Sequence, residues 1–101
     1  MTTETAGNSE QDSLFFRLCS DHLSIEAIPR RAMSIDLVNL KGQGITGYQI
    51  MLWTPHFAVL RNEQGHEITL RRNGRMIIRK AGSEDMARQS AIQLMGLIRG
   101  C

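Results

Sequence analysis

Residues 57–80, FAVLRNEQGHEITLRRNGRMIIRK, decide the fold. This stretch contains three short runs of alternating side chains, which are separated by two turns that end in glycine, Glu63-Gln64-Gly65 and Arg72-Asn73-Gly74. The pattern predicts three consecutive antiparallel strands joined by hairpins. Each turn is expected to be a three-residue loop whose glycine adopts the left-handed conformation.

The register of these hairpins follows from the need for one apolar face, because a one-residue slip moves every side chain to the opposite face. A two-residue loop at Asn73-Gly74 would place Leu70 opposite Ile77 and mix the two faces. A three-residue loop instead pairs Leu70 with Met76. The predicted core face then comprises Ala58, Leu60, Ile68, Leu70, Met76 and Ile78. The opposite face comprises Phe57, Val59, Arg61, Glu67, Thr69, Arg71, Arg75, Ile77 and Arg79.

The C-terminal segment predicts a helix that covers the core face. Ser83 is a suitable N-cap, and Glu84 and Asp85 follow it in the first turn, where the helix dipole favours negative charge. We predict a helix over Glu84–Arg99 whose buried stripe repeats at helical spacing. The stripe consists of Ala87, Ala91, Leu94 and Ile98.

The segments upstream of residue 57 predict two further strands and a short helix. Leu23–Ile28 alternates apolar and polar residues and indicates a first strand, and Thr46–Trp53 indicates another. Ser34–Leu40 is expected to form a short helix capped by Ser34, and Leu14–Ser20 a helical turn. The predicted fold class is therefore α+β: a curved antiparallel sheet with a short helix and a long C-terminal helix on one face.

The chain has 101 residues, which is enough for one domain. Residues 1–13 are polar and acidic and predict a disordered tail, while residues 14–101 form the single domain. The net charge of the chain is +2, and the tail carries −3, so the domain carries +5. No apolar run approaches the length of a membrane helix, and no signal peptide is visible. Cys19 and Cys101 are therefore predicted to be reduced thiols. A cytoplasmic protein without membrane contact is expected.

The arrangement of these predicted elements resembles one half of a TATA-binding protein. The resemblance is best over residues 74–91 and is carried by Gly74-Arg75-Met76-Ile77-Ile78, Ala81, Ser83-Glu84-Asp85, Arg88 and Ala91, with weaker matches at Asp36-Leu37 and Phe57. It implies a half-saddle sheet and a nucleic-acid-binding sheet face. The family inserts two phenylalanines per half between base steps. Here Phe57 matches the first, whereas Arg71 stands at the second position and Arg79 replaces a small groove-facing residue.

The side chains that we predict to form a binding site lie on the face opposite the helix. Arginines there can contact phosphates and an aromatic ring can stack on bases, which makes nucleic acid, DNA or RNA, the leading ligand. The alternative is a protein-interaction or homodimer surface on the same face, and a third reading is a regulatory domain that binds an organic anion. Plain solvation of the face also stays open. The candidate residues are Arg61, Arg71, Arg75, Arg79 and Phe57.

No pattern in the sequence predicts catalysis, a metal or a cofactor. Residues 19–22, Cys-Ser-Asp-His, are half of a metal motif without a second half, and His56 and His66 stand alone. No serine or cysteine is expected beside a histidine and an orienting carboxylate. The chain is therefore expected to be a non-enzymatic binding module.

The strand that contains Met51 and Trp53 is apolar at consecutive positions. Such a strand is usually covered on both sides. Because the predicted helices can cover only one side, this strand predicts a homodimer.

Overall fold

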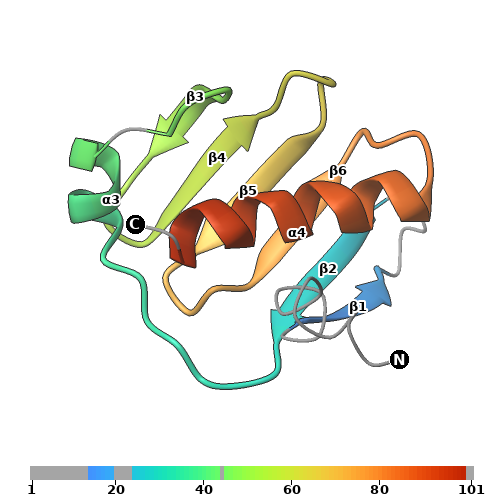
Figure 1. Ribbon diagram of the computed structural model, residues 1–101, viewed down its shortest axis with the longest axis horizontal. Helices are drawn as coiled ribbons and strands as arrows, with labels where there is room; N and C mark the ends of the chain where they lie inside the picture. The colour runs from blue at the N-terminus through green and yellow to red at the C-terminus, as the bar shows by residue number, and fades with distance from the viewer. Residues whose placement is uncertain (1–13, 20–23, 44, 100–101) are drawn as a thin grey trace, which may run out of the picture.

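The computed structural model describes residues 14–19, 24–43 and 45–99, and it confirms the α+β class (Figure 1). Within these residues, six strands form one antiparallel sheet accompanied by two helices. The predicted acidic tail and Cys101 lie outside the described residues. The elements are β1 (Leu14–Leu18), β2 (Ser24–Pro29), α3 (Leu37–Gln43), β3 (Gln49–Trp53), β4 (Phe57–Arg61), β5 (Glu67–Arg71), β6 (Met76–Arg79) and α4 (Glu84–Arg99).

The order of the strands in the sheet is β1-β2-β6-β5-β4-β3. After β2 the chain passes through α3 to the far edge at β3, and the meander from β3 to β6 then returns until β6 pairs with β2. α4 lies across one face of the sheet, and α3 lies near the C-terminal end of α4 (Figure 1). Segments that are distant in sequence, such as β2 and β6, therefore become neighbours.

Both predicted hairpin registers are confirmed. Leu70 pairs with Met76 across β5 and β6 and with Ala58 across β4 and β5. Gly65 and Gly74 have φ angles of +85° and +87°, which is the left-handed conformation that the three-residue loops require. All six residues of the predicted core face are buried. The sequence alone therefore separates the two faces of these three strands correctly.

The predicted C-terminal helix is also confirmed. α4 spans Glu84–Arg99, and the Ser83 hydroxyl accepts a hydrogen bond of 3.2 Å from the Met86 N–H, as an N-cap does. Its buried side chains pack against the apolar face of the sheet and complete the core. They are Ala87, Ala91, Leu94 and Met95, and the predicted stripe residue Ile98 is half-buried against them.

The predicted helical turn near the N-terminus is wrong, because Leu14–Leu18 forms the edge strand β1. The strand pairs with β2 in antiparallel register, with Phe15 opposite Ile28 and Arg17 opposite Glu26. Five residues are too few to stabilise a helix in isolation, whereas pairing with β2 buries Leu14 and satisfies the backbone. Tertiary pairing decides the conformation of this segment.

The short helix is correctly predicted but misplaced. α3 begins at Leu37 rather than at Ser34, and its cap is Asp36, whose carboxylate accepts a hydrogen bond of 3.1 Å from the Asn39 N–H. Ser34 precedes Ile35, whose N–H is bonded to the carbonyl of Arg72 at 2.8 Å. This contact with the β5–β6 turn keeps Ser34 and Ile35 out of the helix.

Trp53 is covered within the chain. Its indole Nε1 donates a hydrogen bond of 2.9 Å to the carbonyl of Leu37, and its ring packs against the core beneath α3. Trp53 is paired with Ala58, a core residue, whereas Leu52 is paired with Val59 on the opposite face. Trp53 therefore gives no support for a homodimer, and the exposed apolar part of β3 is restricted to the residues before it.

Candidate functional site

The face of the sheet opposite α4, hereafter the outer face, brings together side chains from all six described strands. Strand pairing places Arg61, Glu67 and Arg79 in one row across β4, β5 and β6. The Glu67 carboxylate lies 4.0 Å from the Arg79 guanidinium. One carboxylate thus stands between two of the predicted site arginines and offsets part of their positive charge. The sequence analysis did not predict this.

A second carboxylate, Glu26, holds two arginines of the outer face. Its oxygens lie 2.6 Å from Arg17 and 3.3 Å from Arg75. Arg75 is therefore a member of an ion-pair cluster, a pairing that the sequence analysis did not predict. Arg17 was missed because the strand that carries it was not predicted. In all, the outer face combines five arginines with two glutamates, which leaves an excess of three positive charges: Arg17, Arg61, Arg71, Arg75 and Arg79 against Glu26 and Glu67.

Phe57 and Arg71 are direct neighbours on the outer face. They are opposite each other in the β4–β5 ladder, a placement that brings the two side chains within contact distance. Phe57 is half-buried and Arg71 is exposed. Among the ion pairs of the described residues, none includes Arg71. The predicted site residues Phe57 and Arg71 are thus adjacent, with a ring and a guanidinium both reachable from solvent.

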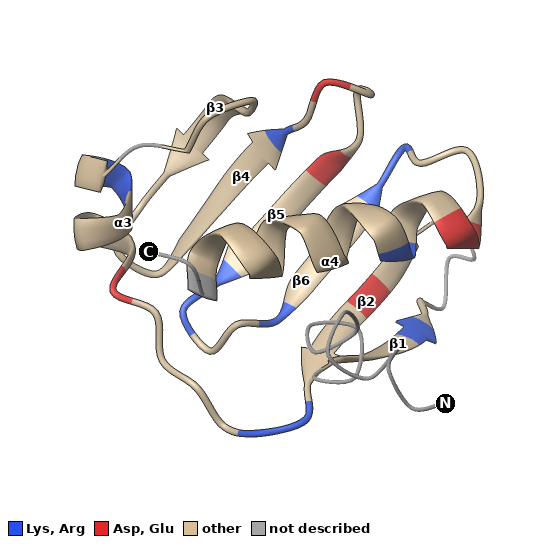
Figure 2. Cartoon of the chain, in the orientation of Figure 1, with Lys and Arg blue, Asp and Glu red and all other residues tan. Residues whose placement is uncertain are grey.

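The tertiary structure adds two arginines to one end of the sheet. The segment after β2, which contains Arg30 and Arg31, lies against the β5–β6 turn, because Pro29 and Met33 surround Gly74. Residues 29–35 and 71–75 contain no acidic residue, and Figure 2 shows basic residues in both segments at this end. We call this cluster the arginine rim. It consists of the exposed residues Arg30, Arg31, Arg71, Arg72 and Arg75.

Arg30 and Arg31 were not among the predicted site residues. Their signal in the sequence is a pair of adjacent arginines directly after a predicted strand, but nothing in the sequence places that pair beside the β5–β6 turn. The guanidinium of Arg30 lies 4.8 Å from the centroid of the Phe15 ring, which is within the range of a cation–π contact.

The centre of the outer face is apolar. Val59 and Ile77 are half-buried, as is Thr69 between them. Phe15 on β1 and Leu52 on β3 extend this apolar surface toward both edges of the sheet. Neither described helix covers these side chains, because both helices pack on the opposite face (Figure 1). The outer face is therefore an apolar surface bordered by arginines.

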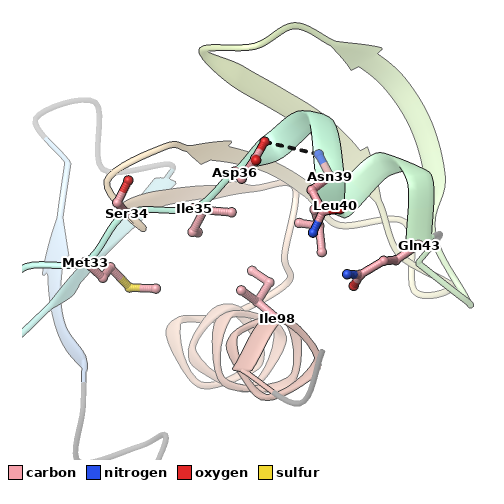
Figure 3. Close-up of a pocket in the computed structure, with 8 residues that line it drawn as sticks. All are labelled: Met33, Ser34, Ile35, Asp36, Asn39, Leu40, Gln43 and Ile98. Carbon is pink, nitrogen blue, oxygen red and sulfur yellow. Dashed lines mark hydrogen bonds between the residues drawn. The ribbon is translucent and has the colours of Figure 1, made fainter.

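The cavity between α3 and α4 is a less suitable site (Figure 3). It has a volume of about 260 Å³, and Met33, Ile35, Leu40 and Ile98 contribute apolar side chains to its wall. Asp36 is the single charged residue of its lining, and its carboxylate already caps α3. The cavity thus offers no free charged group to a ligand.

A wider groove lies between α4 and the segment before β3. It is lined by Tyr48, Glu63 and Leu97, among others, and it is largely open to solvent. Burial against the core raises the pKa of Tyr48 above its ordinary value of 10.0, because the phenolate loses hydration. Glu63 is the only charged residue in the lining and is exposed. The groove carries no cluster of groups that would bind or transform a small molecule.

One serine does lie beside a histidine, although the hydrogen bonds of this pair include no carboxylate. The Ser90 hydroxyl is 2.6 Å from His66 Nδ1 and accepts a hydrogen bond of 3.0 Å from the side chain of Asn62. His66 and Ser90 are only 4% and 3% exposed. The hydroxyl is already engaged by Asn62 and His66, and we assign the network to the attachment of the β4–β5 turn to α4.

Comparisons with known proteins leave the site to be interpreted from its own geometry. No family model, no curated protein and no solved structure matches the chain at a significant level. Within the described residues, no group of three or more histidine, cysteine or acidic side chains is placed to hold a metal ion. Neither α3 nor α4 has the length and apolar character that a membrane crossing requires.

Proposed function

We propose that this chain is a non-enzymatic module that binds nucleic acid through the outer face and the arginine rim. The observation that carries the proposal is the rim, where two distant segments bring five exposed arginines to one end of the sheet. Among the described residues, Glu26 is the one carboxylate in an ion pair with a member of the rim. Regularly spaced phosphates are the ligand that such a cluster of guanidinium groups suits best.

The outer face supplies the second element of the proposed site. Phe57 beside Arg71 forms a platform on which a base can stack, with the guanidinium close enough to contact a phosphate or the base itself. The half-buried Val59 and Ile77 continue this platform. Because no base-specific hydrogen-bonding pattern is involved, we expect binding with little sequence preference.

The resemblance to one half of a TATA-binding protein supports the same conclusion. The order of β2, α3, the four strands β3 to β6 and α4 is the order on which the resemblance rests. Arg71 stands where the family has its second wedge phenylalanine, next to Phe57. An exposed arginine cannot separate stacked bases as a phenylalanine does, so the proposal is surface binding and not minor-groove wedging.

The test is a salt-dependent titration with short duplex and single-stranded oligonucleotides. If phosphates bind to the face, log affinity falls with log salt by ~0.7–0.9 per contact. Replacing Arg71, Arg75 and Arg79 together by alanine should flatten this slope by about two to three units. Arg71→Ala alone should also reduce the slope. Its matched control is Arg88→Ala on α4, which should leave the slope unchanged. Absence of oligonucleotide binding even at low salt would refute the proposal.

A second candidate function is assembly through the same face. The apolar centre of the outer face, with Phe57, Val59 and Ile77 half-buried, favours it. In that case oligonucleotides bind weakly or not at all, and the triple arginine variant changes the affinity for the partner. Phe57→Ala also separates the two: it should weaken single-strand binding by roughly 1–3 kcal/mol if bases stack on it, or weaken the assembly.

A further inference from the structure

The edge strand β3 differs from every other described strand. Its sequence, Gln-Ile-Met-Leu-Trp, contains no charged residue and no proline. The other five described strands each carry at least one charged side chain: Arg17, Glu26, Arg61, Glu67 with Arg71, and Arg79. Proteins usually protect a sheet edge with charge or proline against pairing with another chain. Apart from a bulge, β3 lacks this protection.

The side chains of β3 are apolar on both sides of the sheet. Ile50, Met51 and Leu52 are 45%, 42% and 48% exposed. The bulge between Ile50 and Leu52 shifts the register against β4, with Ile50 opposite Leu60 of the core and Leu52 opposite Val59 of the outer face. Three consecutive large apolar side chains at an edge are unfavourable in water. An uncharged apolar edge of this kind is suited to pairing with another polypeptide.

We propose that β3 is the edge through which two copies of this chain pair in antiparallel orientation. A partner must offer a free strand edge and apolar side chains on both sides of the sheet, and it must bury no charge. A second β3 meets all three requirements, and its uncharged sequence creates no like-charge repulsion across a two-fold axis. β1, the other edge, carries Arg17 and is less suited to self-pairing. α3 lies next to β3 (Figure 1), and its Val38 is also an exposed apolar residue.

This pairing has a geometric consequence. A two-fold axis perpendicular to the sheet reverses the direction of the strand and keeps the same face upward. The two six-stranded sheets thus continue into one another, and both outer faces lie on the same side. Dimer formation extends the arginine-bordered surface rather than covering it. The dimer itself does not depend on whether that surface binds nucleic acid.

The test is sedimentation velocity of the full chain over a concentration series, with charge placed on each edge in turn. The unmodified chain should be a dimer. Leu52→Lys and, separately, Met51→Lys should raise the dimer dissociation constant by on the order of a hundredfold, because two like charges would meet at the interface. Phe15→Lys is the matched control on β1, where the ring is 46% exposed. It should leave the dimer intact.

Three outcomes would overturn the edge pairing: a monomeric unmodified chain at high micromolar concentration, a dimer that survives both β3 lysines, or a dimer that Phe15→Lys disrupts as strongly. Circular dichroism and thermal unfolding show that each variant is folded, and two separate lysine positions guard against a local defect. Oligonucleotide titration of Met51→Lys, which leaves Leu52 of the outer face unchanged, keeps the two proposals distinct, since retained binding by this monomeric variant supports the binding site independently of the dimer.

Discussion

The two faces of the sheet are built from alternate residues of the same strands, yet they differ in almost every property. On the face beneath α4, Leu60, Ile68 and Leu70 are fully buried. On the outer face, Val59 and Thr69, their neighbours in sequence, are only half-buried, and Arg71 is exposed. Because burial of apolar area dominates folding, the covered face must consist of apolar side chains. The outer face is free of that constraint and can carry charge and function.

The largest expected difference between the two faces is in the free energy of unfolding, and two adjacent substitutions on β5 test it. Leu70→Ala removes a fully buried side chain from the core and should lower the free energy of unfolding by about 2–4 kcal/mol. Thr69→Ala, one residue away on the outer face, should lower it by less than about 1 kcal/mol. Denaturant unfolding of the two variants measures both values. Similar losses at the two positions would show that the outer face contributes to the core.

The register that separates the two faces depends on the glycines of the two hairpins, which gives a second test. Gly65→Ala places a β-carbon on a left-handed residue with open space around it, at a cost of about 1–2 kcal/mol from backbone strain alone. Gly74→Ala adds a steric conflict, because its β-carbon would lie less than 3.0 Å from Met33 and Pro29. Its loss of unfolding free energy should therefore exceed that of Gly65→Ala.

Thermal or denaturant unfolding compares the two glycine variants directly. Because Met33 and Pro29 belong to the segment that brings Arg30 and Arg31 to the arginine rim, Gly74→Ala should also weaken oligonucleotide binding. Gly65→Ala should not. Equal stability of the two variants would mean that this segment does not pack tightly against the turn.

The smallest expected effects come from the arginines of the outer face. Arg75→Ala and Arg79→Ala each remove an exposed ion pair, with Glu26 and Glu67 respectively. Each should change the free energy of unfolding by less than about 1 kcal/mol, because solvent screens such pairs. Chemical denaturation provides the measurement. A loss comparable to that of Leu70→Ala would assign these arginines to holding the sheet together and not to binding.

The sequence by itself determines the three strands β4 to β6 and the helix α4. Alternation of apolar side chains, glycine at positions that need positive φ and a serine cap are local signals, and they agree with one another. Since only one register gives Leu70 and Met76 a common apolar face, the hairpins can be derived without knowledge of the rest of the chain. The candidate residues Arg61, Arg71, Arg79 and Phe57 are placed on the outer face by the same argument.

Only the tertiary structure decides what surrounds those residues. The strand β1 forms because β2 offers it a partner, and with it comes Arg17, which shares Glu26 with Arg75. The arginine rim exists because the segment after β2 packs against a turn more than 40 residues further along the chain. Trp53 belongs to the strand from which the sequence predicts a second subunit, but its indole is bonded to α3 of the same chain. Contacts of this kind depend on the path of the whole chain through space, which the periodicity of a short segment does not contain.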